Sequence, residues 1–321
     1  MAVVLVFTNS ADGSHTDVVI EKIIEQGSAV IRFDTDEISS GNHRLLCGLD
    51  SSITLTTPTA EYNLQDANSV WLRRPRVFDF AVNDPVQRIH TENEFKTFLA
   101  GIYVILGDKR WLNTPQAIER AKLKAYQLKL AKELGFQVPD SVITASPEVA
   151  RQFCAQGLTV FKPLAQSNIG GGGKALLIPT TLLTDKHLER LDLIRNQYVL
   201  LQRYIKKHYE LRITFVDGEL FVAKQVPTDN LSASVADWRL LQINRGSAYE
   251  PFHVSEELEC KIKDLVRKLN LNFVALDFAV DLKGNHYFLE INPNGQWFGY
   301  TDAIGMPASS AIARFLTNPG Y

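Results

Sequence analysis

The chain has 321 residues, and its 34 Lys and Arg against 36 Asp and Glu give a formal net charge of -2. Hydrophobic residues make up 45% and charged residues 22%, a globular balance that excludes a largely disordered chain. A near-neutral chain lacks the overall positive field of a general nucleic-acid binder, so any polyanion would have to be bound at a local site. The length allows two or three domains of about 100–200 residues each.

Cysteine usage and the first residues bear on the compartment. Cys47, Cys154 and Cys260 lie far apart and show neither zinc-ligand nor redox spacing. A reduced, cytoplasmic protein is therefore expected. Residues 2–7 are apolar without a basic leader, which favours a first strand over a signal peptide. No apolar run approaches the ~20 residues that span a membrane.

Residues 1–110 form the first expected domain. A strand over 2–7, a helix capped by Thr16 and ended by Gly27, and a strand over 28–33 predict an α/β layer. Short strands are expected over 44–56 and 69–73, and Asp84-Pro85 is typical of a helix start. The first loop lacks G-x-G-x-x-G, so a dinucleotide fingerprint is absent.

Two further units are expected, 111–195 and 196–321. In the first, the patterns predict helices 115–134 and 147–156, a strand 159–162, a glycine-rich loop 166–174 and a strand 175–178. In the second they predict strands 198–205, 210–216 and 219–225, a helix 255–269, and strands 275–282 and 286–291. Asp217-Gly218 is a strong signal for a hairpin turn.

The loop from Ser167 to Lys174 contains four consecutive glycines between two predicted strands. Glycines allow main-chain N–H groups to converge on a phosphate, and Lys174 adds positive charge. The spacing is not that of a Walker A loop, because Ala175 stands where that motif needs Ser or Thr. The alternative is a flexible hairpin loop without a ligand.

A hairpin turning at Lys283-Gly284 would place Asp277 opposite Glu290, with Asn292 on the same face. The other face would carry an apolar set that must be the core side: Phe278, Val280, Tyr287, Leu289 and Ile291. Hard oxygen ligands of this kind suit Mg²⁺, which commonly bridges to nucleotide phosphates. The alternative is a solvated strand face.

Isolated basic residues are ambiguous by themselves. Lys124 and Lys162 could be ordinary lysines with solvated ammonium groups, but their order before the glycine loop and the acidic face favours a phosphate site. The segment Trp71-Leu72-Arg73-Arg74-Pro75-Arg76 could bind carboxylates or phosphates, or form a structural salt bridge within the first domain. Strand alternation predicts that Val70 and Leu72 are buried, while Trp71 and Arg73 face an interdomain cleft.

The chain resembles the ATP-grasp ligases, and more closely the microviridin-type peptide maturases, the graspetide synthetases. The motifs that carry this resemblance are Trp71-Leu72-Arg73-Arg74, Leu211-Arg212-Ile213-Thr214, Asp237-Trp238-Arg239 and the run Leu289–Trp297. The fold implied is α/β (α+β), an ATP-grasp fold with an N-terminal α/β pre-ATP-grasp domain. A glycine-rich lid would lie in the central subdomain, and the metal site in the C-terminal one.

The resemblance also implies roles for individual residues. Lys124 and Lys162 match the lysines that hold ATP, and the lid residues implied are Ser167, Asn168, Gly170, Gly171, Gly172 and Lys174. The adenine segment would be Gln202, Arg203, Tyr204 and Ile205, and Glu210 would bind ribose. Arg203 departs from the family, which usually has Glu there. Arg212, Lys162 and Arg239 would be catalytic, and Asp277, Glu290 and Asn292 would hold Mg²⁺. The substrate-binding set would be Arg73, Arg74, Asp237, Trp238 and Arg239.

By resemblance, the activity is ATP-dependent joining of Asp or Glu side chains of a ribosomal precursor peptide to Ser or Thr hydroxyls or Lys amines. A leader segment of that peptide would tether the core, and a homodimer is expected. One alternative is a ligase that adds an amino acid to a small molecule or protein terminus. Another is a nucleotide-binding scaffold without turnover, which the complete Asp277, Glu290 and Asn292 set argues against. Nothing indicates a nucleic-acid or membrane partner.

Overall fold

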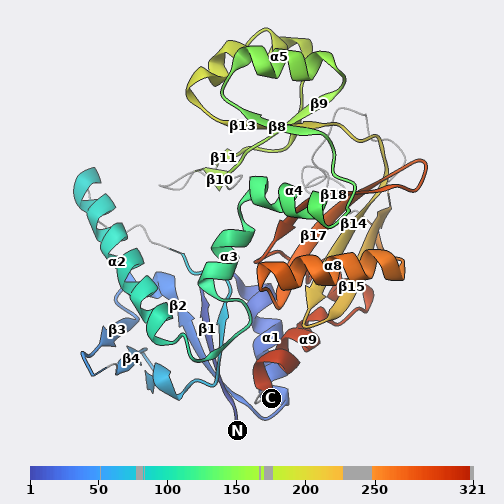
Figure 1. Cartoon of the computed structure of the whole chain (residues 1–321). Helices are drawn as coiled ribbons and strands as arrows, with labels where there is room; N and C mark the ends of the chain where they lie inside the picture. Colours follow the sequence, from blue (N-terminus) through green and yellow to red (C-terminus); the bar gives the residue numbers. More distant parts are fainter. Residues whose placement is uncertain are drawn as a thin grey trace.

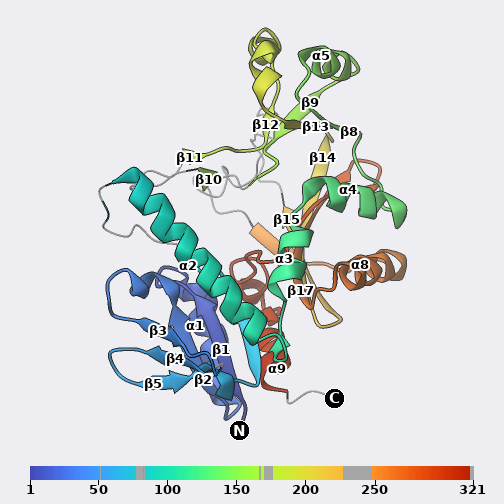
Figure 2. The ribbon, with the colours of Figure 1, turned by 60° about the vertical axis from the view of Figure 1, so that its left-hand side comes forward.

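The computed structural model describes residues 1–50, 52–76, 82, 84–165, 168–169, 176–226 and 248–318 (Figures 1 and 2). Strands and helices are both present, as the mixed α/β expectation requires. Most of the predicted lid and the Asp237-Trp238-Arg239 motif lie outside the described residues, and of Asn168 only the backbone is described. No helix in the described ranges is long and apolar enough to cross a membrane.

The N-terminal part is built on a parallel sheet in the order β2-β1-β6-β7. Its strands are β1 (Val3–Thr8), β2 (Ala29–Asp34), β6 (Ser69–Leu72) and β7 (Arg110–Trp111). Alternate residues of β1 are buried on opposite faces: Leu5 and Phe7 pack toward α2 (Pro85–Ile105), while Val4 and Val6 pack toward α1 (Gly13–Glu25). The expected strand–helix–strand opening is therefore confirmed.

Two helix starts in this part can be compared with the capping residues expected from the sequence. The Asp84 carboxylate accepts a hydrogen bond from the Gln87 N–H, so α2 begins with the expected cap and proline. Helix α1 begins at Gly13 instead of after Thr16, whose buried hydroxyl donates to the Asp12 carboxylate at 3.1 Å. A smaller antiparallel sheet lies beside the main one and consists of β3 (Arg44–Cys47), β4 (Ile53–Thr56) and β5 (Glu61–Asn63).

The central part is an antiparallel sheet in the order β12-β9-β13-β8. Its elements are β8 (Ser141–Thr144), α5 (Pro147–Ala155), β9 (Thr159–Lys162), β12 (Thr181–Leu182), α6 (Asp185–Leu188) and β13 (Val199–Arg203). It has its own small core, formed by Ala150, Leu191, Ile194, Val199 and Leu201. The hairpin of β10 (Asn168–Ile169) and β11 (Leu176–Leu177) extends from it.

The C-terminal part is a five-stranded antiparallel sheet in the order β16-β15-β14-β17-β18. Its strands are β14 (Lys207–Val216), β15 (Glu219–Val226), β16 (Ala248–Pro251), β17 (Phe273–Asp281) and β18 (His286–Asn292). Asp217-Gly218 forms the expected tight turn, with positive φ at both residues. Helix α8 (Glu256–Leu269) packs on one face of this sheet.

The expected boundaries at 110/111 and 195/196 divide elements that the structure joins. The predicted helix 115–134 is two helices, α3 (Pro115–Ala121) and α4 (Lys124–Glu133), and both pack into the core of the C-terminal sheet. Strand β13, expected in the C-terminal unit, pairs with β8 and β9 of the central sheet. The limits of these units are set by strand pairing and side-chain packing between residues far apart in the sequence. Local composition does not show such contacts.

The last helix, α9 (Ala308–Thr317), returns to the N-terminal part and packs against α1 (Figure 1). The buried Ser69 hydroxyl donates to the Leu316 carbonyl at 2.6 Å. Trp71, Val216, Trp297 and Ile312 share one core cluster, so the N-terminal and C-terminal parts are joined by a packed interface. The remaining short 3₁₀ turns are Thr35–Ile38, Leu64–Asp66, Leu191–Asn196 and Asp302–Ile304.

Candidate active site

A pocket opens between the central sheet and the C-terminal sheet, with about 570 Å³ of empty space partly open to solvent. Residues of β9, β13, β14, β17 and β18 line it, so both sheets contribute walls. The lining residues are Val160, Lys162, Thr180, Gln202, Arg203, Tyr204, Ile205, Lys207, Glu210, Asp277, Ala279, Leu289 and Glu290. Five of the charged residues singled out from the sequence therefore meet at one cavity, namely Lys162, Arg203, Glu210, Asp277 and Glu290.

The acidic face of the β17–β18 hairpin has the predicted register at its centre, because Asp277 pairs opposite Glu290. Nearer the turn the register shifts by one residue, so Phe278 pairs with Phe288 and Leu289 is the extra residue of a β-bulge. Phe288 is fully buried, while Tyr287 and Leu289 are half-buried. The expectation that Tyr287 and Leu289 face the core is therefore wrong.

Asn292 lies two residues beyond Glu290, opposite Ala275, and so shares the face of the two carboxylates. Its side-chain oxygen accepts a hydrogen bond from the Asn294 N–H at 3.0 Å. No group of three or more His, Cys, Asp or Glu converges on a metal-sized site among the residues that the structure describes. Two carboxylates and one amide oxygen suit a hard cation that keeps water and phosphate oxygens as its other ligands.

Two lysines face this acidic pair. The Lys124 ammonium, at the start of α4, lies 3.5 Å from the Glu290 carboxylate. Lys162 ends β9 and is 8% exposed. Burial lowers the pKa of Lys162, and the Lys124 charge adds to this, while Glu290, Asp277 and Glu210 oppose it. The two cations and two anions thus form one coupled cluster at the pocket.

Arg212 is bonded to the acidic face directly. Its Nη1 donates to Asp277 Oδ1 at 2.7 Å and its Nη2 to the Gln296 carbonyl at 3.0 Å. Burial opposes the charge of Arg212, but Asp277 and Tyr300 together raise the pKa of its guanidinium. A Cβ on Gly295 would lie 2.9 Å from Nη2, so glycine lets the main chain run close to this arginine.

The predicted adenine segment borders the pocket at the end of β13. The Gln202 amide donates to the Ser141 hydroxyl at 3.0 Å, which ties β13 to β8. The unusual Arg203 points away from this contact: it stacks on Phe153 at 4.4 Å and donates to the Phe153 and Gly157 carbonyls. It therefore caps the C-terminal end of α5, where a positive charge is favourable and a glutamate would not be.

Glu210 lines the pocket with 12% of its side chain exposed, and it forms an ion pair with Lys207. Burial raises the pKa of the Glu210 carboxyl, and Lys207 opposes this shift. Lys207 is not among the residues expected at the site, because residues three apart on a regular strand point to opposite faces. A register irregularity between Lys207 and Tyr209 brings it round to Glu210.

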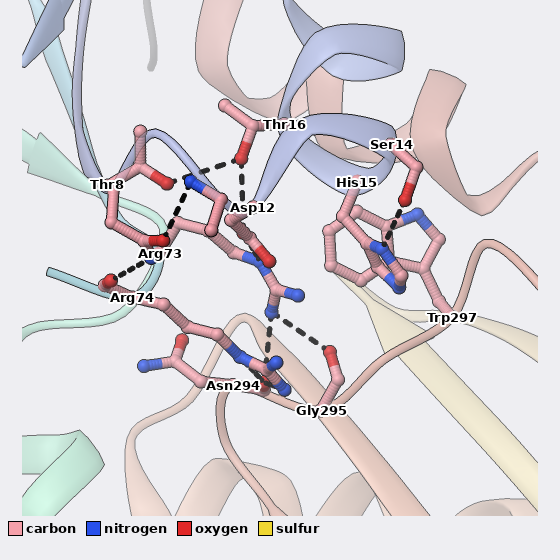
Figure 3. A network of polar contacts seen from close by, with 12 residues as sticks. Thr8, Asp12, Ser14, His15, Thr16, Arg73, Arg74, Asn294, Gly295 and Trp297 are labelled. Carbon is pink, nitrogen blue, oxygen red and sulfur yellow. Dashed lines mark hydrogen bonds and ion pairs between the residues drawn. The ribbon is translucent and has the colours of Figure 1, made fainter. Parts of the chain in front are cut away.

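The motif Arg73-Arg74 lies against the segment that follows Asn292, and both of its side chains reach Asn294 (Figure 3). Arg73 is fully buried: its Nε donates to Asp12 at 2.8 Å, and its Nη1 to the Asn294 and Gly295 carbonyls at 2.9 and 3.1 Å. Its guanidinium also lies 4.7 Å over the Trp297 ring. Burial, helped by the Arg74 charge, lowers the pKa of Arg73 to about 9.

The expectation that Trp71 and Arg73 face an open cleft is therefore wrong, because that face is packed against the Asn294–Trp297 segment and α9. The ion pair of Arg73 with Asp12 is the structural salt bridge that the sequence analysis weighed as the alternative. Arg74 is also largely buried and donates to the Asn294 carbonyl at 2.9 Å. Its guanidinium interacts electrostatically with Arg212 and Tyr300, so it lies toward the active-site side.

Comparisons with known proteins agree with this geometry. Residues 3–119 match the MvdD pre-ATP grasp domain, and residues 119–316 match the RimK-like ATP-grasp domain. No curated protein sequence matches the chain. The two matched ranges meet at residue 119.

Solved structures resemble the whole chain. A RiPP-associated ATP-grasp ligase of Chryseobacterium gregarium, in complex with ADP and a leader and core peptide, is 27% identical with a TM-score of 0.90, covering 100% of this chain and 98% of that one. The macrocyclase MdnC of Microcystis aeruginosa MRC, bound with precursor peptide MdnA, is 26% identical with a TM-score of 0.85, covering 98% and 99%.

The ATP-grasp ligase PsnB, complexed with a minimal precursor, Mg and ADP, is 20% identical with a TM-score of 0.75, covering 99% and 96%. At that identity the likeness shows the fold alone. The ATP-grasp match spans more than half of the 321 residues, and the pocket lies where the two sheets of that domain meet. The chain therefore belongs to the RimK-like ATP-grasp family, with an MvdD-type pre-ATP-grasp domain ahead of it.

Proposed function

We propose that the chain is an ATP-dependent ligase that closes rings in a ribosomal precursor peptide by joining Asp or Glu side chains to Ser, Thr or Lys side chains. The observation that carries the proposal is the meeting of Lys162, Asp277 and Glu290 at one pocket between two sheets, beside the buried Arg212. The whole-chain likeness to ligases solved with precursor peptides supports the peptide as substrate.

In the first step, a carboxylate oxygen of the peptide attacks the γ-phosphorus of ATP and ADP leaves, which forms an acyl phosphate. In the second, a hydroxyl or amine attacks the acyl carbon, gives up its proton, and phosphate leaves. Lys162 and Arg212 would neutralise the charge that develops on the phosphoryl oxygens, and Lys124 would hold the nucleotide phosphates. Gln202–Ile205 would bind adenine, and Glu210 the ribose.

The metal ligands proposed are Asp277, Glu290 and Asn292, whose oxygens suit Mg²⁺. A bound Mg²⁺ would neutralise phosphate charge and orient the reacting oxygens. In the structure Lys124 and Arg212 pair with the two carboxylates, so positive charge is already balanced against them. Both carboxylates are therefore kept beside cations in a pocket that a phosphate chain could enter.

Arg74 is proposed as the holder of the peptide carboxylate before its activation. An anion beside the γ-phosphate needs a cationic partner, and Arg74 lies toward Arg212 while Arg73 is occupied by Asp12 and the Asn294–Gly295 carbonyls. Asp237, Trp238 and Arg239, outside the described residues, complete the proposed substrate set. A homodimer and a cytoplasmic location remain parts of the proposal, as does microviridin-like chemistry.

The test is incubation of the purified chain with Mg²⁺, ATP and a leader-bearing peptide rich in Asp, Glu, Thr, Ser and Lys. Mass spectrometry should show the loss of one water for each ring, with one ADP released each time. A free amino acid plus a small acceptor should give no ADP, which separates this proposal from the amino-acid ligase. A chain that binds nucleotide but never releases ADP would be the scaffold instead.

A further inference from the structure

Strand β18, which carries Glu290 and Asn292, is the last strand of its sheet. One side of it pairs with β17, so the outward N–H and C=O groups of alternate residues need other partners. Near its start this need is met by main chain, because the Phe288 N–H donates to the Gln137 carbonyl at 2.8 Å. Near the proposed metal ligands, a side chain supplies the hydrogen bonds to these backbone groups.

That side chain is Gln127 of α4, which is 2% exposed. Its Nε2 donates to the Ile291 carbonyl at 3.1 Å, and its Oε1 accepts from the Ile291 N–H at 3.1 Å. The same Nε2 donates to the Ala121 carbonyl at 2.6 Å, at the end of α3. One carboxamide thus replaces a neighbouring strand at the residue between Glu290 and Asn292.

The same helix also reaches the carboxylate itself. Lys124, three residues before Gln127, lies 3.5 Å from Glu290. Residues three apart on a helix share a face, so α4 presents a cation to the Glu290 side chain and an amide to the adjoining backbone. Helix α4 therefore fixes the position of β18 relative to Lys124, the lysine proposed to hold the nucleotide phosphates.

We infer that Gln127 is a positioning residue for the metal site: by clamping both main-chain groups of Ile291, it sets the direction in which Glu290 and Asn292 present their oxygens. The inference rests on the proposed function, because it takes Glu290 and Asn292 as the ligands. Groups that orient metal ligands typically contribute 10–100-fold to metal affinity. Gln127 touches neither nucleotide nor metal in this role.

The experiment measures metal binding without turnover. The melting temperature is followed during a Mg²⁺ titration at saturating ADP, and ADP binding is measured separately without metal. Gln127→Met keeps the length and helix preference of the side chain and removes its hydrogen bonds. We expect the Mg²⁺ midpoint to rise about 10-fold, with metal-free ADP affinity changed less than about twofold.

A matched control separates positioning from simple loss of a buried hydrogen bond. Ser69→Ala removes the bond to Leu316 between β6 and α9, away from the pocket. It should lower the melting temperature of the free protein as Gln127→Met does, and leave the Mg²⁺ midpoint where the wild type has it. If Gln127→Met fails to fold, Gln127→Glu decides, since it keeps the acceptor for the Ile291 N–H and loses the donor. We expect at least a threefold rise in its Mg²⁺ midpoint.

An unchanged Mg²⁺ midpoint in a folded Gln127→Met protein, or in Gln127→Glu if only that variant folds, would overturn the inference. An equal rise in Ser69→Ala would overturn it too, because general loosening would then explain the effect. If Mg²⁺ does not change the melting temperature of the wild-type protein in the presence of ADP, the proposed metal site itself is wrong. That last result contradicts the proposed function and is distinguishable from failure of Gln127 alone.

Discussion

The structure contains two groups of buried basic residues that differ in what they face. Lys162 and Arg212 lie with carboxylates at a pocket, whereas Arg73 is surrounded by Asp12, Trp297 and main-chain carbonyls. Both groups contain buried cations with shifted pKa values. The pKa is lowered for Arg73 and Lys162 and raised for Arg212. Burial of a charge is therefore common to both groups, and they differ in that Lys162 and Arg212 line pockets whereas Arg73 does not line either of them.

The largest effect expected from this comparison is on stability. Arg73→Ala removes the cation paired with the Asp12 carboxylate and the donor to the Gly295 carbonyl, so the free energy of unfolding should fall by about 3–5 kcal/mol. Urea denaturation measures it. Nucleotide affinity, leader affinity and cyclisation should decline together as the protein loosens. Near-wild-type stability with a selective loss of cyclisation would show that Arg73 handles substrate after all.

The pocket side should give the opposite pattern. Glu290→Gln removes a charge from the proposed metal ligands, and peptide-dependent ADP release should fall on the order of 100-fold. The melting temperature without nucleotide should change little, since Glu290 faces the pocket. Glu133→Gln, at an exposed pair with Lys129 on α4, is the control and should keep full activity. Normal turnover by Glu290→Gln at saturating Mg²⁺-ATP would show that Glu290 is not a metal ligand.

Arg74 lies between the two groups and sharpens the comparison. Arg74→Ala should reduce cyclisation about tenfold or more through lost positioning of the peptide carboxylate. Its effect on stability should be smaller than that of Arg73→Ala, because Arg73 also donates to the Asn294 carbonyl. The measurements are cyclised product by mass spectrometry, leader binding and melting temperature. Unchanged cyclisation in Arg74→Ala would leave the motif purely structural.

The smallest effect is a pH dependence at His15, which lies edge-on to Trp297 at 4.9 Å. Burial, reinforced by Arg73, lowers the pKa of His15 to about 4 from an ordinary 6.5. Between these values the unfolded chain binds the proton and the folded chain does not, so stability falls as pH drops from about 6.5 to 4. His15→Gln should make this slope shallower in denaturation at several pH values, whereas the exposed His90→Gln should not. Equal slopes in the wild type and His15→Gln would refute the assignment.

Local sequence patterns predict the helices and strands better than they predict the contacts between them. The strand Thr159–Lys162, the Asp84-Pro85 helix start and the pairing of Asp277 with Glu290 follow from alternation, capping and turn chemistry. The bulge at Leu289 does not, because shifting a strand by one residue still leaves apolar residues on both faces of this segment. The sequence spacing therefore predicted the pairing of Asp277 with Glu290 and the burial of Phe278, Val280 and Ile291, but not the half-buried positions of Tyr287 and Leu289.

Residues that depend on distant contacts could not be assigned from the sequence. Arg73 looked free because its partners Asp12 and Asn294 lie 61 and 221 residues away. Gln127 is not among the residues expected at the site, although one signal was present: it falls on the same stripe as Leu130 and Ala131, which are buried. A polar residue on an apolar helix stripe indicates a specific buried partner, here the backbone of Ile291.

The central claim is that a peptide side-chain carboxylate is activated as an acyl phosphate. Its direct test uses a leader-bearing precursor whose Asp and Glu carboxylates carry oxygen-18. The account predicts that, for each ring formed, the phosphate released carries one oxygen from the carboxylate, and that ADP release requires the leader. Phosphate that never acquires the label, or ADP release that proceeds equally well with a free amino acid, would contradict it.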